Sequence, residues 1–157
     1  MDSDGVNWLS PDEQANWRQL VALLFRLPGA LDAQLQRDAG ISNFEYMVLS
    51  QLSEAEKHTL RMSDLAAMAS GSLSRLSHLF KRLEQRGLAR READPADGRF
   101  TNAILTQEGF QALANAAPGH VAHVRSLVID ALSADQLRRL GRDAERIMSR
   151  IDTTAIN

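Results

Sequence analysis

Apolar residues recur every three or four positions in the first quarter of the chain, which is the spacing of one face of an α-helix. Ser10 is a suitable N-cap ahead of Pro11, a residue favoured in the first turn. The pattern predicts a helix from Pro11 to near Gly40, either continuous and kinked at Pro28 or made of two abutting helices. The apolar positions are Trp17, Leu20, Val21, Leu24, Leu27, Leu31 and Leu35.

Three shorter helices are predicted in the middle of the chain. Ser42 and Glu45 have the spacing of a capping box and start the first of them, and Ser63 caps the second. Gly87 is a good residue to end the third, because glycine adopts the left-handed conformation common after a helix. The expected ranges are 42–57, 64–69 and 72–86, with an extended piece at 59–62 and a tight turn at 70–72.

Two short runs with strand-like residues follow, at 88–93 and 100–105, and six residues join them. Thr106 caps a further helix, whose apolar pattern is interrupted at Pro118-Gly119 and then resumes. Ser133 and Gln136 form a second capping box, which starts a last helix. The segment 59–106 thus has the element order of a winged helix-turn-helix. The predicted fold is mainly α with a small β-wing, and long helices flank the winged helix on both sides.

The helix predicted at 72–86 has two different faces. Five apolar residues fall within an arc of roughly 120° and are expected to pack inward. Short hydroxyls, an imidazole and cations occupy the rest of the surface, and no acid lies there in the first ten residues. Such groups suit phosphates and base edges. The apolar set is Leu73, Leu76, Leu79, Phe80 and Leu83, and the polar set is Ser74, Arg75, Ser77, His78, Lys81, Arg82 and Gln85.

The predicted hairpin carries charge where most hairpins carry turn residues alone. Asp97 and Gly98 favour a turn with positive φ, and Asp97 is placed to accept hydrogen bonds from Arg99. An arginine on a narrow hairpin fits the minor groove, where the negative potential attracts it. Arg90 and Arg91 at the base are placed for phosphates. The candidate DNA contacts are Ser72, Ser74, Arg75, Ser77, His78, Lys81, Arg82, Arg90, Arg91, Asp97 and Arg99.

Charge is distributed unevenly along the 157 residues. The chain has a net charge of −2, which by itself argues against a nucleic-acid partner. Residues 57–100, however, contain nine Lys and Arg against five acids, a net +4, and the rest of the chain carries −6. A basic segment between acidic ends is typical of polyanion binding.

The composition and the absence of known motifs exclude several other classes of protein and functional site. There is no cysteine, which removes disulfides, thiolate metal sites and thiol chemistry. No apolar run reaches the ~18 residues of a membrane span, and the acidic N-terminus is unlike a signal peptide, so a cytoplasmic location is expected. No phosphate-binding loop, zinc-protease motif or nucleophile elbow is present, so we expect neither an enzyme nor a bound cofactor.

Three motifs resemble the MarR family of transcriptional regulators: SRLSHLFKRLEQRGLARR at 74–91, DPADGR at 94–99 and LTQEG at 105–109. The resemblance extends over about residues 12–150. It implies a homodimer in which each subunit offers one winged helix to half of a palindromic operator, and a repressor released by a small, often aromatic, acid. It implies a dimerisation helix at 1–40, a winged helix at 41–106 and dimerisation helices at 107–157, intertwined in one domain. Independently, the apolar stripes of the outer helices exceed what a winged helix can cover, and a dimer would bury them.

A ligand site is less well marked. Trp17 and Tyr46 are candidates for an aromatic wall and Arg18 for a carboxylate clamp, although a tryptophan at that spacing is more often core or interface. His120 and His123 have the spacing of two metal ligands, but no further ligand is evident, and we expect no metal site. The alternative function is a winged helix used for protein contact, or an enzyme accessory domain, without DNA binding.

Overall fold

The fold was analysed in a computed structural model that describes residues 5–68 and 73–155. The chain forms two compact units, Met1–Ala116 and Ala117–Asn157, which are treated separately. The first unit holds the winged helix, and the second holds the C-terminal helical segment. Helices dominate, with one small three-stranded antiparallel sheet, so the predicted fold class is confirmed.

Helix α1 spans Pro11–Ala39 without interruption, so the sequence alternative of two abutting helices is wrong. Ser10 and Glu13 form a reciprocal capping box, and Gly40 closes the helix in the left-handed conformation. Pro28 lies inside the helix. A proline removes one main-chain hydrogen bond there, and the remaining bonds of a 29-residue helix are sufficient to keep it continuous.

Helix α2 spans Asn43–Glu54 and begins at the predicted capping box of Ser42 and Glu45. A short 3-10 turn, η1 (Glu56–His58), leads into strand β1 (Thr59–Arg61). Helix α3 spans Met62–Met68, so it starts one residue before Ser63, and the prediction that Ser63 caps it is wrong. The strand runs directly into the helix, which leaves no separate cap. The predicted turn at 70–72, with Ser72, lies outside the described residues.

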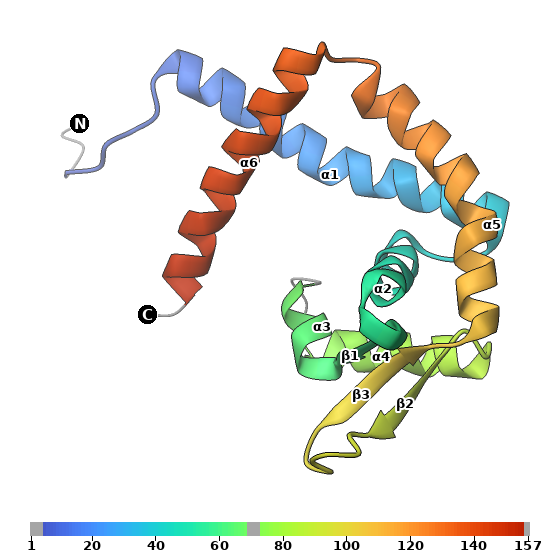
Figure 1. The fold of residues 1–157 in the computed structure, drawn as a ribbon. Coiled ribbons are helices and arrows are strands. Elements are labelled where there is room, and N and C mark those ends of the chain that lie inside the picture. The colour runs from blue at the N-terminus through green and yellow to red at the C-terminus, as the bar shows by residue number, and fades with distance from the viewer. Residues whose placement is uncertain (1–4, 69–72, 156–157) are drawn as a thin grey trace. The chain divides into compact units, whose positions relative to one another are not determined.

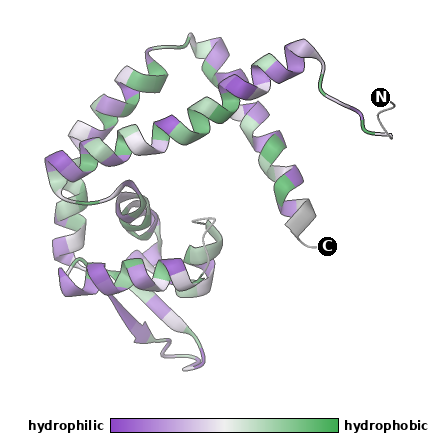
Figure 2. Ribbon diagram, turned by 180° about the vertical axis from the view of Figure 1, so that it is seen from behind, coloured by the Kyte–Doolittle hydropathy of each residue, from purple (hydrophilic) through white to green (hydrophobic). Residues whose placement is uncertain are grey.

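Helix α4 spans Leu73–Gln85 and has the two faces expected from the sequence. Figure 2 shows hydrophilic and hydrophobic residues alternating along it. Leu76, Leu79, Phe80 and Leu83 are buried, whereas Leu73 is 55% exposed, so the predicted stripe is one residue too long. Leu73 is the first residue of α4. The chain then turns at Gly87, whose φ of 69° is in the region that favours glycine.

Strands β2 (Ala89–Ala93) and β3 (Thr101–Leu105) form an antiparallel hairpin, and β1 pairs with the other edge of β3. The hairpin register places Ala89 opposite Leu105 and Ala93 opposite Thr101. In Figure 1 the hairpin extends away from α2, α3 and α4. We call β2, β3 and the loop between them the wing.

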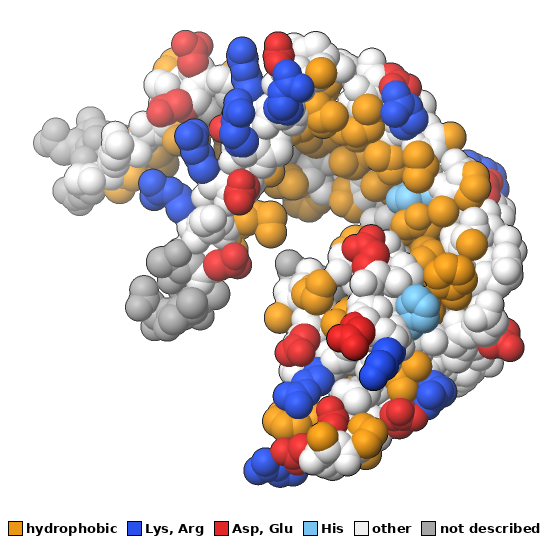
Figure 3. All heavy atoms as spheres, viewed as in Figure 1, with side chains coloured by type: hydrophobic (Ala, Val, Ile, Leu, Met, Phe, Trp, Pro, Cys, Tyr) orange, Lys and Arg blue, Asp and Glu red, His pale blue; other side chains and the backbone are white. Residues whose placement is uncertain are grey.

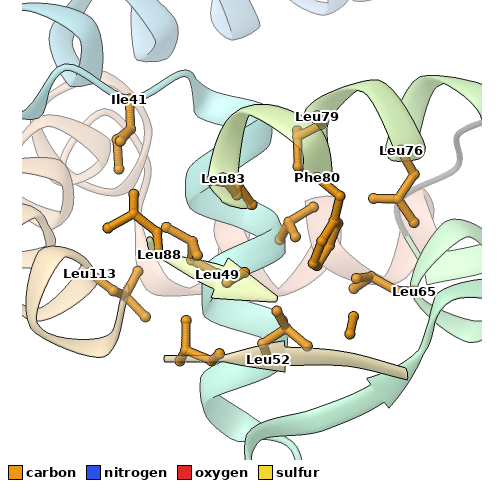
Figure 4. Packing of buried hydrophobic residues seen from close by; sticks show 14 of the residues in the cluster. Ile41, Leu49, Leu52, Leu65, Leu76, Leu79, Phe80, Leu83, Leu88 and Leu113 are labelled. Atoms are coloured by element: carbon orange, nitrogen blue, oxygen red, sulfur yellow. The ribbon is translucent and has the colours of Figure 1, made fainter. Parts of the chain in front are cut away.

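One hydrophobic core joins the elements of the first unit. Phe80 and the leucines of α4 point toward Leu49 and Leu52 of α2 and Leu65 of α3 (Figure 4). Leu35 at the end of α1 and Ile41 just after it are also fully buried in this cluster. The C-terminal part of α1 is therefore packed into the winged helix.

Helix α5 spans Gln107–Val124 and is capped by Thr106, whose Oγ1 accepts a hydrogen bond from the Gly109 amide at 3.0 Å. A Cβ at Gly109 would collide with the Leu88 carbonyl oxygen, which explains the glycine in the LTQEG motif. The interruption predicted at Pro118-Gly119 is wrong: the helix continues through Pro118 and passes into a π-helical turn, Arg125–Ile129.

Helix α6 spans Ala134–Ala155 and begins after the predicted capping box of Ser133 and Gln136. Basic side chains line α6 in Figure 3, and its other side carries apolar residues that remain exposed in the single chain. The first part of α1 likewise exposes large apolar side chains. The exposed set is Trp17, Leu23, Leu24 and Phe25 on α1, and Leu140, Ile147, Met148 and Ile151 on α6. None of the described helices has the length and apolar character needed to cross a membrane.

Candidate nucleic-acid interface

Four residues form what we call the polar face of α4: Ser74, Ser77, His78 and Lys81. Ser74, His78 and Lys81 are exposed and Ser77 is half-buried, on the side of α4 away from the core. These four residues, together with Leu73 and Arg91, line an open groove of about 470 Å³. Hydroxyls, an imidazole and an ammonium are thus placed together on one accessible surface, as the sequence predicted.

Arg75 and Arg82 lie on the other flank of the helix, where both are held by residues at the start of α2. The Arg75 guanidinium lies over the Phe44 ring at 4.8 Å from its centroid. Arg82 donates from Nε to Oε1 of the buried Glu45 at 3.2 Å. Both arginines remain exposed at their outer surface. Their side chains attach α4 to α2, and a DNA contact by either remains a prediction.

Arg86 extends this attachment to the end of α1. Its Nη1 donates to the Gly40 carbonyl oxygen at 3.0 Å and lies 3.9 Å from Oε2 of Glu45. Glu45 therefore serves the capping box of α2 and faces Arg82 of α4 and Arg86 directly after it. The sequence identified Glu45 only as a cap, because nothing in the spacing of residues 45, 82 and 86 shows that the fold brings them together.

The wing loop is ordered by two aspartates. Oδ1 of Asp94 accepts from the amides of Ala96 and Asp97 at 2.8 and 3.3 Å. The Asp94 amide donates to the Phe100 carbonyl at 2.9 Å and closes the loop. A turn forms at Gly98 and Arg99, and the Phe100 amide donates to the Asp97 carbonyl oxygen at 3.0 Å, so the expected turn is confirmed. Gly98 is not among the described residues with positive φ, so the expected left-handed conformation is wrong. Side-chain hydrogen bonds fix the loop in place of a left-handed glycine.

Asp97 holds Arg99 at the tip, as the sequence predicted. Nη2 of Arg99 lies 2.6 Å from Oδ2 of Asp97, and the Arg99 amide donates to Oδ1 at 3.1 Å. The arginine keeps the pKa of the Asp97 carboxyl below its usual value. The Arg99 side chain is nevertheless 85% exposed, so the aspartate restricts its direction and leaves its outer surface accessible. Figure 3 shows basic and acidic side chains intermingled over the wing.

Arg61 on β1 contacts the wing, although the sequence analysis assigned it no role. Its guanidinium lies 4.0 Å from the centroid of the Phe100 ring, and its Nε lies 3.8 Å from Oδ2 of Asp94. Arg61 therefore supports the root of the loop from the neighbouring strand. Its place in the basic segment was visible in the sequence, but the pairing of β1 with β3 was not.

The two arginines at the wing base differ. Arg90 is exposed and pairs with Glu92 on its own strand. Arg91 is partly buried and makes a bidentate ion pair with Glu84 of α4, with 2.6 Å between Nη2 and Oε2. This pairing lowers the pKa of Glu84 and raises that of Arg91. Phosphate contacts by either arginine remain predictions.

The candidate ligand residues have separate surroundings. Trp17 is exposed on α1, and Arg18 donates to Gln14 on the same helix at 3.0 Å. Tyr46 packs against the core of the first unit, and burial raises the pKa of its hydroxyl. These contacts do not by themselves form a pocket, and the aromatic wall and carboxylate clamp remain predictions.

The two histidines of α5 gain no further metal ligands from the fold. Among the described residues, no group of three or more His, Cys, Asp and Glu side chains is placed to hold a metal ion. Burial, together with the nearby His123, lowers the pKa of His120.

Known proteins match both the sequence and this arrangement of elements. The model of the MarR family matches residues 39–99. The HTH-type transcriptional regulator MhqR of Bacillus subtilis is 30% identical over 115 residues, which cover 68% of this chain and 77% of MhqR.

Two solved structures match almost the whole chain. Sco3205, a MarR family transcriptional regulator from Streptomyces coelicolor solved in complex with DNA, is 42% identical, with a TM-score of 0.89 over 92% of this chain and 94% of that one. AbsC, a MarR family regulator from the same organism, is 36% identical, with a TM-score of 0.90 over 94% of this chain and 99% of that one. This chain belongs to the MarR family of transcriptional regulators.

Proposed function

We propose that this protein binds a palindromic DNA operator as a homodimer and represses transcription until a small ligand releases it. Helix α4 enters the major groove and Arg99 enters the adjacent minor groove. The observation that carries the proposal is the combination of the polar face of α4 with an exposed arginine held at the tip of an ordered wing. Sco3205, 42% identical to this chain, was solved in complex with DNA.

The chemistry of the polar face supports base and backbone contacts. Ser74 and Ser77 have short side chains, which allow the helix to approach the groove floor closely. His78 and Lys81 reach further and offer donors to phosphate oxygens or to guanine. Arg90, exposed at the wing base, is placed to contact the phosphates between the two grooves.

The exposed apolar faces of α1 and α6 support a homodimer. Leu24 is 60% exposed and Ile151 is also 60% exposed in the single chain. Large apolar patches on a soluble protein mark an interface. We assign dimerisation to residues 1–40 and 107–157 and DNA binding to residues 41–106. A two-fold dimer presents two α4 helices to half-sites about one helical turn apart, which a palindrome provides.

Repression and release follow from this geometry. A dimer bound across a promoter excludes other proteins from the same DNA. A small aromatic acid that favours a different spacing of the two α4 helices would lower operator affinity, since only one spacing fits both half-sites. Trp17, Arg18 and Tyr46 are the proposed contacts for its ring and carboxylate.

The test is fluorescence anisotropy on the DNA upstream of the protein's own gene and on a duplex selected by the protein from a random pool. A scrambled duplex serves as the control, at two salt concentrations. We expect specific binding that weakens steeply with salt. Transcription from the bound promoter, with and without aromatic acids, then tests repression and release. Equal weak binding to every duplex, or no binding at low salt, would instead favour a winged helix used for protein contact.

A further inference from the structure

We propose that Glu84 and Arg91 are a positioning pair that fixes the wing against α4 and orients the Ser77 hydroxyl so that its hydrogen is available to DNA. The proposal rests on the proposed function, because both α4 and the wing are assigned to DNA there. It gives Arg91 a different role from the phosphate contact predicted from the sequence. It also makes Glu84, an acid facing a DNA-binding surface, necessary for affinity.

The pair joins two elements that approach different grooves. Oε1 of Glu84 on α4 accepts from the backbone amide and from Nε of Arg91 on β2, both at 3.0 Å. Oε2 accepts from Nη2 at 2.6 Å. Both side chains are about 30% exposed, so Arg91 is shielded more than Arg90 and Arg99, whose side chains are 54% and 85% exposed. Three hydrogen bonds to one carboxylate restrict both the distance and the angle between helix and strand.

The same contacts occupy three of the five N–H donors of the Arg91 guanidinium. A guanidinium recognises phosphate with two parallel N–H donors, and Arg91 uses that edge on Glu84. Nη1 of Arg91 also donates to the Ser77 hydroxyl oxygen at 3.1 Å. The more exposed Arg99 and Arg90 lack such a link to α4, since each pairs with an acid of the wing itself.

The hydrogen bond from Arg91 to Ser77 restricts the direction in which the Ser77 hydroxyl can donate its hydrogen. A serine hydroxyl has one donor hydrogen and two acceptor lone pairs, and Arg91 occupies a lone pair. The hydrogen is therefore directed away from Arg91, and Ser77 lines the groove of the polar face of α4. A donor at this position fits a phosphate oxygen, guanine O6 or N7, adenine N7 or thymine O4. The second lone pair of the hydroxyl can still accept a hydrogen bond from an amino group of cytosine or adenine.

The decisive comparison uses two acids near the DNA. Glu84→Gln and Glu92→Gln each remove one negative charge. Glu92 lies one residue from Arg91 and pairs with Arg90. Simple electrostatics predicts that both changes tighten DNA binding. We expect Glu92→Gln to bind the selected duplex as tightly as the parent or more tightly. We expect Glu84→Gln to bind it about tenfold more weakly, as for residues coupled in one ion-pair network. Binding to a scrambled duplex should not weaken in either variant.

Arg91→Gln separates positioning from direct contact. We expect the same tenfold loss, an unchanged dependence of affinity on salt, and a Glu84→Gln/Arg91→Gln double variant no weaker than either single one. A direct phosphate contact would instead reduce the magnitude of the salt slope by about 0.9. That result, or Glu84→Gln binding as tightly as Glu92→Gln, would overturn the proposal.

Two controls keep the outcome clear. Thermal unfolding of each variant shows whether weaker binding comes from loss of the fold. The loss of DNA affinity in the double variant is compared with the losses in the single variants at a temperature where all of them are folded. The charge-exchanged pair Glu84→Arg/Arg91→Glu should regain part of the affinity lost by Arg91→Glu alone, because an ion pair is restored. Failure of the parent protein to prefer any duplex would contradict the proposed function itself, whereas a binding parent with an unaffected Glu84→Gln contradicts only the positioning role.

Discussion

Helices α4 and α6 are both strongly amphipathic, yet their apolar residues have different surroundings. Leu76, Leu79 and Leu83 of α4 are at most 1% exposed, whereas Leu140 and Ile147 of α6 are 42% and 49% exposed. The apolar side of α4 is covered by α2, α3 and the sheet of the same unit. An amphipathic pattern therefore predicts a helix and its apolar side, but not whether the cover comes from the same chain.

The difference has a functional meaning. A helix whose apolar side is satisfied within the chain has its polar side available for another molecule, here DNA. A helix whose apolar side is left exposed requires a partner of matching character, and a second copy provides one. Family membership confirms that the protein is a transcriptional regulator and not an enzyme. This role agrees with one helix, α4, that has its polar side available for DNA and another, α6, that has its apolar side available for a second subunit.

The largest expected effect follows from placing charge on the exposed apolar side of α6. Ile147→Asp/Ile151→Asp should give a monomer by analytical ultracentrifugation, because burying two unpaired carboxylates in an interface is costly. Operator affinity should fall by on the order of 10² or more, since two linked half-site contacts become one. Ser149→Asp, on the opposite side of α6, is the control and should remain dimeric. A charged double variant that stays dimeric would show that α6 is not in the interface.

A second comparison lies within α4 itself. Leu76→Ala should lower the free energy of unfolding by about 2–5 kcal/mol, because it opens a cavity in the core. Leu73→Ala, the same chemical change three residues earlier, should cost less than about 0.5 kcal/mol, because Leu73 is exposed. Urea denaturation at one protein concentration measures both. Equal costs would mean that the start of α4 is covered in solution.

The wing tip gives the next effect. Arg99→Ala should weaken operator binding by about 1–3 kcal/mol with little change in thermal stability, because Arg99 makes its contacts at the surface. Asp97→Asn keeps the arginine but weakens the bonds that hold it. Its loss of operator affinity should be smaller than that of Arg99→Ala. Fluorescence anisotropy on the selected duplex measures both. An Arg99→Ala variant that binds like the parent would remove the wing from the interface.

The smallest effect is a pH dependence of wing order. The pKa of Asp94 is lowered mainly by the Ala96 amide, and that of Asp97 mainly by Arg99. A carboxyl whose pKa is lowered on folding adds stability above its ordinary pKa, and that stability is lost as pH falls through the lowered value. The loop should therefore stay ordered at neutral pH and loosen below about pH 4.

Amide chemical shifts of Asp94 and of residues 96–100, followed from pH 6 to pH 3, measure this transition. Asp97→Asn should remove the pH-dependent change in chemical shift that comes from the Asp97–Arg99 pair. The change that comes from titration of Asp94 should remain. Shifts that do not change with pH in the parent chain would show that the carboxylates do not order the loop.

Much of the fold and of the candidate site was predictable from local sequence. The N-cap at Ser10, the capping boxes at Ser42 and Ser133 and the stop at Gly87 depend on residues within a few positions of one another, so spacing alone identifies them. The polar face of α4 followed from helical periodicity, and the bond between Asp97 and Arg99 from their closeness in the chain. These interactions do not need the rest of the protein.

Only the tertiary structure decided which distant residues meet. Glu84 and Arg91, Arg61 and Phe100, and Arg82 and Glu45 are brought together by the packing of α4 on α2 and by the pairing of β1 and β2 with β3. Spacing along the chain carries no information about such contacts, because they depend on how whole elements pack. The sequence thus determined the elements and the chemistry of each face, and the fold decided which arginines are held by partners and which apolar faces remain to be covered.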